Sequence, residues 1–250
     1  MSRRPLVAAN WKMNHLRADA AACCRALRQA LAERPAAARV AIFPSFPLIP
    51  VVAAELAGSE LAVGGQDLHP DDQGAHTGDV SGAQLADAGC AWVLCGHSER
   101  RQDHGEDDAL VARKVAAAVR HRLAPLICVG ETRDERRAGR TFGVLERQLR
   151  SAVAALSEGA PFAVAYEPVW AIGTGETATP ETAQEVHAFL RLLLAELVEG
   201  AAAALPILYG GSATPDNAAG LFAQPDVDGF LVGGASLDPR KFLAIIRHSG

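Results

Sequence analysis

Apolar residues form eight short runs that recur along the whole chain. Each run has the length of a strand, and its residues are apolar nearly throughout rather than in alternation. Continuous apolar runs of this kind are typical of parallel strands that are covered on both faces. We therefore predict eight buried parallel strands, at Leu6–Asn10, Arg39–Phe43, Leu61–Gly65, Ala91–Cys95, Pro125–Val129, Phe162–Tyr166, Pro206–Tyr209 and Gly229–Val232.

The segments between these runs carry helical patterns. Arg17–Ala32 and Ala109–Arg122 are predicted helices, and the last predicted helix carries Phe242, Ile245 and Ile246. The clearest apolar stripe has the i, i+3, i+4, i+7 spacing of a helix face and consists of Val186, Phe189, Leu190, Leu193, Leu194 and Leu197. Helix starts are indicated by capping-box spacing or by a capping residue before proline, at Ser81 with Gln84, Thr132 with Glu135, Thr179-Pro180, Thr214-Pro215 and Asp238-Pro239.

The order of these elements predicts one domain of the α/β class. Eight strands, each followed by a helix, fill 250 residues, and no linker or shift in composition divides them. Eight such units suit a closed parallel barrel better than an open doubly wound sheet, and two half-domains of four units would need a linker. We therefore expect a single (β/α)8 barrel over residues 1–250, with its reactive residues where strands end and loops begin.

Composition and charge exclude several classes of function. Lys plus Arg number 24 and Asp plus Glu 29, which gives a net charge of −5. Such a chain has no overall positive field for nucleic acid or an anionic membrane, so a bound anion needs a local site. No apolar stretch is long enough for a signal-peptide core or a membrane span. The five cysteines include no CxxC pair, which indicates a reducing compartment, so we expect a cytoplasmic protein.

Side chains that can do chemistry follow three of the predicted strands. Asn10 ends the first strand with Lys12 just beyond it, His97 follows the fourth strand, and Glu167 follows the sixth. Taken singly, each has a plainer interpretation as a solvated or core residue, but in a barrel all three strand ends share one rim. A carboxylate, an imidazole and an ammonium suit proton abstraction beside a carbonyl, with the developing oxyanion held by donors. This set lacks the second carboxylate of a glycosidase and the nucleophile elbow of a hydrolase.

His97 stands directly before a predicted helix start at Ser98 and Glu99. A helix N-terminus disfavours a positive charge. We therefore expect His97 to stay neutral and to donate a hydrogen bond as imidazole.

Two glycine-rich segments follow the seventh and eighth predicted strands, Gly210-Gly211-Ser212 and Gly233-Gly234. Glycine lets backbone amides approach an anion closely, and a helix start adds its dipole. Loops at these two places often bind phosphate in parallel barrels. A phosphate cradle is therefore predicted, with two tight turns as the alternative.

Two loops differ from the rest in composition. Residues 168–178 follow Glu167 directly and combine prolines and glycines with Trp170 and Ile172. This composition predicts a lid that excludes water. A dinucleotide-binding turn is the disfavoured alternative. Residues 67–79 are polar and rich in Asp and His, but their spacing matches no EF-hand or zinc pattern, so no metal is expected. We interpret them as an interface loop, with a solvated loop as the alternative.

The chain resembles the triosephosphate isomerase family over essentially all 250 residues. Each matching motif alone could mislead, but five in the same order are very specific. They are NWKMN at residues 10–14, GHSERR at 96–101, AYEPVWAIGTG at 165–175, YGGS at 209–212 and LVGGASL at 231–237.

The resemblance implies a TIM barrel, a triose phosphate substrate, no cofactor and roles for five residues. Glu167 would be the base that moves a proton between two carbons of dihydroxyacetone phosphate and D-glyceraldehyde 3-phosphate. Neutral His97 and Lys12 would stabilise the enediolate, and Asn10 would position a substrate oxygen. Glu99, together with the preceding serine, would support the site.

The resemblance also implies phosphate contacts and a homodimer. Amides around Gly173, Ser212, Gly233 and Gly234 would hold the phosphate. Thr77 would reach across the dimer interface toward Asn10 and Lys12 of a second copy, and Gln66 resembles another interface position.

The chain departs from the family pattern at two places. Glu176 stands in the second hinge of the lid, where relatives often carry Lys or an apolar residue, and Asp79 stands where Glu is usual. We also expect mild oxidation sensitivity at Cys95, next to the site. Two alternatives remain: a phosphosugar epimerase, which would want a metal cluster, or a non-catalytic scaffold, which would have lost Glu167, His97 or Lys12.

Overall fold

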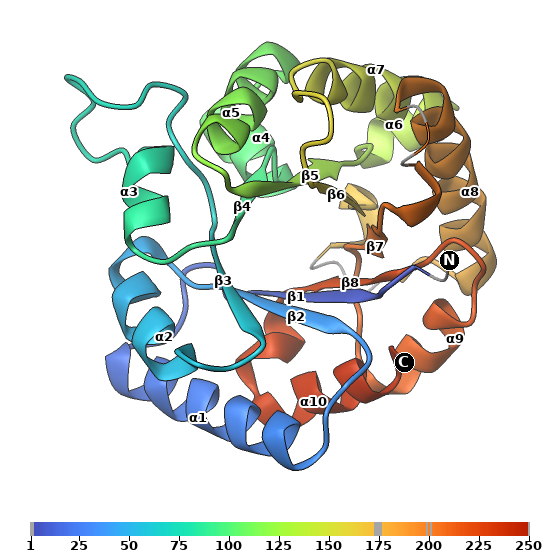
Figure 1. Cartoon of the computed structure of the whole chain (residues 1–250). Coiled ribbons are helices and arrows are strands. Elements are labelled where there is room, and N and C mark those ends of the chain that lie inside the picture. The colour runs from blue at the N-terminus through green and yellow to red at the C-terminus, as the bar shows by residue number, and fades with distance from the viewer. Residues whose placement is uncertain (1–2, 173–176, 199, 201, 250) are drawn as a thin grey trace.

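A closed ring of eight parallel strands forms the centre of the protein. The computed structural model describes residues 3–172, 177–198, 200 and 202–249. The strands follow one another around the ring in chain order, and β1 pairs with both β2 and β8 (Figure 1). The predicted barrel is confirmed, and each strand starts within one residue of its predicted start. The strands are β1 (Leu6–Asn10), β2 (Arg39–Phe43), β3 (Leu61–Gly65), β4 (Trp92–Cys95), β5 (Ala124–Val129), β6 (Ala163–Tyr166), β7 (Ile207–Tyr209) and β8 (Gly229–Val232).

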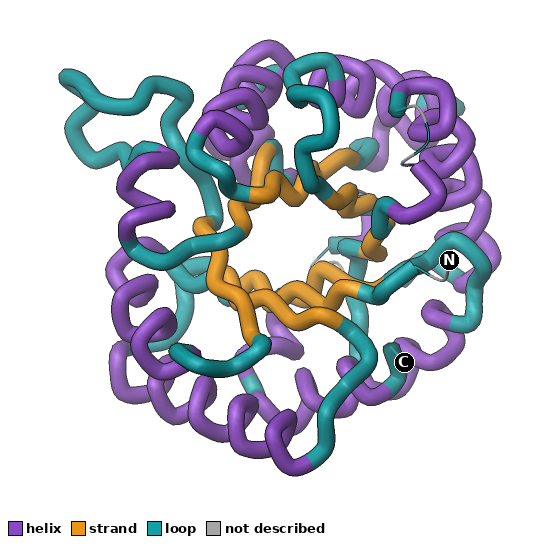
Figure 2. Tube along the Cα trace, in the orientation of Figure 1, coloured by secondary structure: helices purple, strands orange, loops and turns teal. Residues whose placement is uncertain are grey.

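Helices cover the outside of the strand ring (Figure 2). Two helices follow β4, where the sequence predicted both a start at Ser98 and a helix over Ala109–Arg122, and two follow β5, where it predicted a single start at Thr132. Gly105 and Gly139, with φ of +69° and +67°, adopt the left-handed turn that stops a helix, after α4 and α6 respectively. The helices among the described residues are α1 (Arg17–Glu33), α2 (Ile49–Leu56), α3 (Gly82–Asp87), α4 (Ser98–His104), α5 (Asp108–Arg120), α6 (Arg133–Arg137), α7 (Thr141–Val153), α8 (Pro180–Leu197), α9 (Pro215–Phe222) and α10 (Pro239–Arg247).

The strands bury both faces, which explains their continuous apolar runs. Side chains alternate along each strand between the inside of the barrel and the layer under the helices. In β1, Leu6 and Ala8 belong to the inner cluster, whereas Val7 and Ala9 pack in the outer one. The inner cluster also contains Phe43, so the barrel is a filled core rather than a pore.

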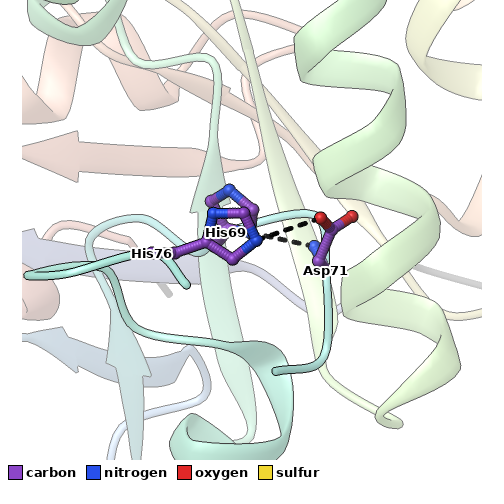
Figure 3. Close-up of side chains that lie close together, drawn as sticks. All are labelled: His69, Asp71 and His76. Carbon is purple, nitrogen blue, oxygen red and sulfur yellow. Dashed lines mark hydrogen bonds and ion pairs between the residues drawn. The ribbon is translucent and has the colours of Figure 1, made fainter. Parts of the chain in front are cut away.

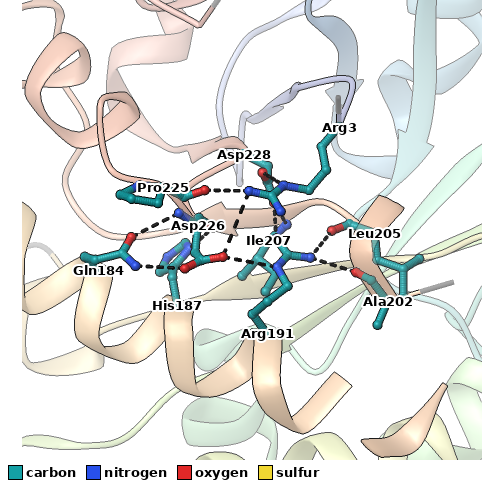
Figure 4. Close-up of polar contacts among 10 residues, drawn as sticks. All are labelled: Arg3, Gln184, His187, Arg191, Ala202, Leu205, Ile207, Pro225, Asp226 and Asp228. Atoms are coloured by element: carbon teal, nitrogen blue, oxygen red, sulfur yellow. Dashed lines mark hydrogen bonds and ion pairs between the residues drawn. The ribbon is translucent and has the colours of Figure 1, made fainter. Parts of the chain in front are cut away.

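A network of ion pairs ties the amino end of the barrel together (Figure 4). Asp228, which is 5% exposed, accepts hydrogen bonds from Arg3 Nε at 2.5 Å, from Arg191 Nη2 and from the Ile207 amide at 2.9 Å. Arg191 comes from α8 and also donates to Asp226 at 3.4 Å. The network therefore links the N-terminal segment, the start of β7, the approach to β8 and one outer helix.

Asp228→Asn tests this network. The substitution keeps the shape of the side chain but removes the nearer of the two carboxylates that face the partly buried Arg191 guanidinium, so we expect the free energy of unfolding to fall by about 3 kcal/mol. Urea unfolding followed by circular dichroism measures this change. The matched control is Asp87→Asn on exposed α3, which should change the value by less than about 0.5 kcal/mol. Equal stabilities of the two variants would contradict the role of the network.

Candidate active site

The predicted strand-end residues meet at one rim of the barrel. Asn10 ends β1, His97 lies just beyond β4 and Glu167 directly follows β6, and the carboxyl ends of parallel strands lie on the same side. His97 Nε2 lies 2.9 Å from Glu167 Oε1, and Lys12 Nζ lies 2.5 Å from Glu99 Oε1. Glu99 Oε2 is also 3.7 Å from His97 Nδ1. The four ionisable groups therefore form one connected cluster.

The Glu167 carboxylate is buried and well supplied with donors. Its surface is 2% exposed. The Ser98 amide donates to Oε2 at 2.8 Å, and Ser98 Oγ lies 3.3 Å from Oε1. Burial alone would disfavour the charged form, but the adjacent His97 and the Ser98 amide outweigh it and hold the pKa of Glu167 below its ordinary value. The carboxylate is therefore ionised at neutral pH and ready to accept a proton.

His97 caps the start of α4, as its place before Ser98 predicted. Its Nδ1 accepts a hydrogen bond from the Glu99 amide at 3.2 Å. A ring nitrogen that accepts carries no proton, so the ring hydrogen is on Nε2 and points at Glu167. Burial disfavours the imidazolium, but the Glu167 carboxylate raises the pKa of His97 above its ordinary value. The cap and burial thus favour the neutral ring, whereas Glu167 favours the charged one.

The main chain of Lys12 is held in a strained conformation. Its φ of +54° is uncommon for a residue with a side chain. The Lys12 amide donates to Asn10 Oδ1 at 3.0 Å, and Gln66 Nε2 donates to the carbonyls of Lys12 and Phe43, both at 2.9 Å. Gln66, which sequence reasoning assigned only to an interface, therefore braces the Lys12 loop within its own chain. Its place directly after β3 was the signal that could have shown this.

The glycine loop after β8 lies beside the ammonium group. A Cβ atom on Gly233 would stand 3.5 Å from Lys12 Cε. The Gly233 carbonyl accepts from Ser236 Oγ at 2.6 Å, within the short 3-10 turn Gly234–Leu237. Trp11 Nε1 in turn donates to the Ser236 carbonyl at 3.3 Å. The loop is therefore fastened to the segment that carries Lys12.

The structure describes the other predicted phosphate-binding residues only in part. The Ser212 carbonyl accepts from Asn217 Nδ2 at 2.9 Å, which orders the loop after β7. Gly234 is exposed, and a Cβ there would meet nothing within 4 Å. Gly173 lies outside the described residues, as does Glu176.

Glu131, just beyond β5, is a site-related residue that sequence reasoning missed. It is fully buried, and its Oε1 accepts from Tyr166 Oη at 3.2 Å and from Trp170 Nε1 at 3.0 Å, while Arg136 Nη1 lies 3.1 Å away. Trp170 belongs to the predicted lid, so Glu131 fastens the first part of that segment to β6 and α6. Its position at a strand end, like that of Glu167, was the available signal.

The loop between β3 and α3 stands away from the barrel (Figure 1). Residues 71–79 are all exposed, and these include Thr77 and Asp79. Cys95, in contrast, is fully buried, and burial raises the pKa of its thiol strongly. An inaccessible and protonated thiol is a poor target, so the expected oxidation sensitivity is not supported.

The chain is similar to one protein family over nearly its whole length. The family model described as triosephosphate isomerase matches residues 5–249. The chain is 52% identical over 248 residues to the triosephosphate isomerase of Xanthobacter flavus, covering 99% of this chain and 98% of that protein. It is 50% identical to that of Moorella thermoacetica, covering 98% and 99%. Among the described residues, no helix combines the length and the apolar character that crossing a membrane requires.

Gly130→Ala tests how tightly the Glu167 backbone is packed. An added Cβ would lie 1.9 Å from the Glu167 carbonyl oxygen, so the residue must move. We expect turnover to fall by about 100-fold, the typical effect of a displacement near 1 Å. Steady-state kinetics measure this, with circular dichroism to show that the variant is folded. Gly143→Ala on α7 meets nothing within 4 Å and is the control with full activity. A folded Gly130→Ala protein with unchanged turnover would refute the constraint.

Proposed function

The chain belongs to the triosephosphate isomerase family, so its reaction is the isomerisation of a triose phosphate, and we propose that Glu167, His97 and Lys12 carry it out. The substrates are dihydroxyacetone phosphate and D-glyceraldehyde 3-phosphate, and the reaction serves glycolysis and gluconeogenesis. The observation that carries the assignment of residues is the buried pair at the rim, in which a base and a hydrogen-bond donor lie 2.9 Å apart.

The proposed chemistry moves one proton between two carbons. The Glu167 carboxylate takes a proton from C1 of dihydroxyacetone phosphate, and the C–H electron pair forms a C1–C2 double bond while the C2 carbonyl becomes an oxyanion. His97 Nε2–H and the Lys12 ammonium stabilise that oxyanion. Glu167 then returns a proton to C2. The C1 hydroxyl loses its proton and the C2 oxygen gains one, which gives the aldehyde at C1. Atoms and electrons balance within the substrate, so we propose no cofactor.

Substrate binding would rearrange the cluster without disturbing its supports. In the described structure the His97 Nε2–H points at Glu167, and the substrate oxygen would take over this hydrogen bond. In the described structure Ser98 supplies two donors to Glu167, and His97 Nδ1 accepts from the Glu99 amide. Loss of the contact with Glu167 favours the neutral His97 ring, which the family resemblance implies. Asn10 would act through its contact with the Lys12 amide.

The phosphate would lie on backbone amides rather than on a basic patch. The loop at Gly233 and Gly234 adjoins Lys12, which would place the phosphate and the oxyanion on one side of the ammonium. Ser212 would supply a further contact from the neighbouring loop. Gly173 is proposed from the resemblance alone, as is closure of the lid over residues 168–178. A closed lid would protect the enediolate from loss of its phosphate.

We further propose a cytoplasmic homodimer in which loop 67–79 reaches a second copy. Thr77 is exposed, and so are Met13 and Leu16, at 94% and 76%, in the loop that carries Lys12. Large apolar side chains this exposed beside an active site are typical of an interface. Thr77 of one copy would cover this apolar segment of the other. The five buried, unpaired cysteines fit a reducing compartment.

Glu167→Asp tests the choice of base. The shorter side chain withdraws the carboxylate from the substrate carbon, so we expect kcat to fall by about 100-fold with a smaller change in KM. The assay supplies glyceraldehyde 3-phosphate in a buffer without metal. A coupling enzyme then reduces the product, dihydroxyacetone phosphate, and the rate of this reduction is measured. Glu185→Asp on the exposed face of α8 is the matched control. If both variants retained wild-type turnover, another residue would have to be the base.

Met13→Glu tests the proposed dimer. A charge at this exposed apolar position should weaken association, so sedimentation velocity should show monomer at concentrations where the wild type is dimeric. Leu192→Glu replaces another exposed leucine, 69% exposed on α8, and should remain dimeric. A monomeric wild type, or a fully dimeric Met13→Glu protein, would contradict this interface.

A further inference from the structure

Two histidines and an aspartate come together in the loop between β3 and α3 (Figure 3). The imidazole rings of His69 and His76 are stacked, with 3.9 Å between their centroids. Asp71 Oδ2 lies 3.2 Å from His76 Nε2. One potential ligand atom from each of the three side chains lies within 4.8 Å of the other two. Seven positions of sequence separate the histidines, so their proximity results from the path of the loop.

The backbone closes this loop at its base. The His69 amide donates to the Val80 carbonyl at 2.8 Å, and His69 forms a bridge with Ser81. Within the loop, the Asp79 amide donates to the His76 carbonyl at 3.1 Å, in a turn that includes Gly78 with φ of +95°. The two limbs that carry the histidines are therefore held side by side before any ligand arrives.

We propose that His69, Asp71 and His76 bind a divalent transition metal ion, with Zn²⁺ as the best fit. Ligands of a tetrahedral zinc ion at about 2.0 Å lie roughly 3.3 Å apart, and the Asp71–His76 separation already has that value. Two imidazoles and one carboxylate favour Zn²⁺, Ni²⁺ or Cu²⁺ over Mg²⁺ and Ca²⁺, which prefer all-oxygen sites. His69 Nδ1 accepts a hydrogen bond from the Asp71 amide at 3.0 Å, and its Nε2 lies 3.8 Å from Asp79 Oδ2.

Nearby charges set the strength of the site. Arg113 Nη2 lies 3.6 Å from Asp71 Oδ1 and competes for that carboxylate. The opposite oxygen of Asp71 faces His76, so the ion and the guanidinium can share the carboxylate. His76 and Asp71 are exposed, which gives an ion direct entry from solvent.

Bound metal would stiffen the backbone next to Thr77. His76 directly precedes Thr77, so an ion held by His76 fixes the segment that we propose reaches a second copy. This consequence rests on the proposed dimer, whereas metal binding itself does not.

Titration of the metal-free full-length protein with Co²⁺ and Zn²⁺ tests the site. Co²⁺ should develop visible absorption bands on binding, and calorimetry with Zn²⁺ should give one ion per chain. His76→Ala and Asp71→Asn should each weaken binding at least tenfold. His248→Ala, at an exposed histidine after α10, is the matched control and should bind like the wild type.

Two results would overturn the proposal: no Co²⁺ spectrum in the wild type, or equal Zn²⁺ affinity in the wild type, Asp71→Asn and His76→Ala. Circular dichroism shows that each variant is folded. Sedimentation velocity without metal measures dimerisation separately, so failure of the dimer and failure of the metal site are distinguishable.

Discussion

All eight strands run parallel in one closed, hydrogen-bonded ring, and this constraint determines where the strand-end residues lie. Closure leaves no strand edge, so neighbours cannot shift in register without breaking the whole ring. Every strand therefore delivers its carboxyl end to the same rim. Residues as distant in sequence as Lys12, His97 and Glu167 meet there because of strand direction, not because of any local attraction.

The cluster of Lys12, His97, Glu99 and Glu167 behaves as one electrostatic unit. Glu99 pairs with Lys12, its amide holds His97 Nδ1, and His97 in turn contacts Glu167. The Ser98 amide at the start of α4 completes the set by binding the Glu167 carboxylate. A base with a lowered pKa and a donor with a defined tautomer thus result from the same short helix start. Fixing these groups in advance is the main contribution that a rigid site can make to catalysis.

Strands and strand-end residues could be predicted because each leaves a local mark in the sequence. A buried parallel strand such as Leu6–Asn10 is a continuous apolar run, and Glu167 follows such a run directly. The two helices after β4 also leave local marks, the start at Ser98 and the pattern over Ala109–Arg122, whereas only one start, at Thr132, indicated the two helices after β5. The Arg191–Asp228 contact and the grouping of His69 with His76 were missed for a different reason. The first joins segments that are distant in sequence, and the second depends on the path of one loop; spacing along the chain encodes neither.

The most direct test of proton transfer by Glu167 is isomerisation in D₂O. The proton held by the carboxylate during the enediolate stage can exchange with solvent, so product formed in the first turnover should contain deuterium at the carbon that receives the proton. Nuclear magnetic resonance of the product measures this label, after correction for exchange without enzyme. We expect the wild type to incorporate deuterium and Glu167→Gln to show none above that correction. Full turnover by the wild type with no deuterium in the product would show that the transferred hydrogen never exchanges with solvent, as in a direct hydride shift, and would contradict the mechanism.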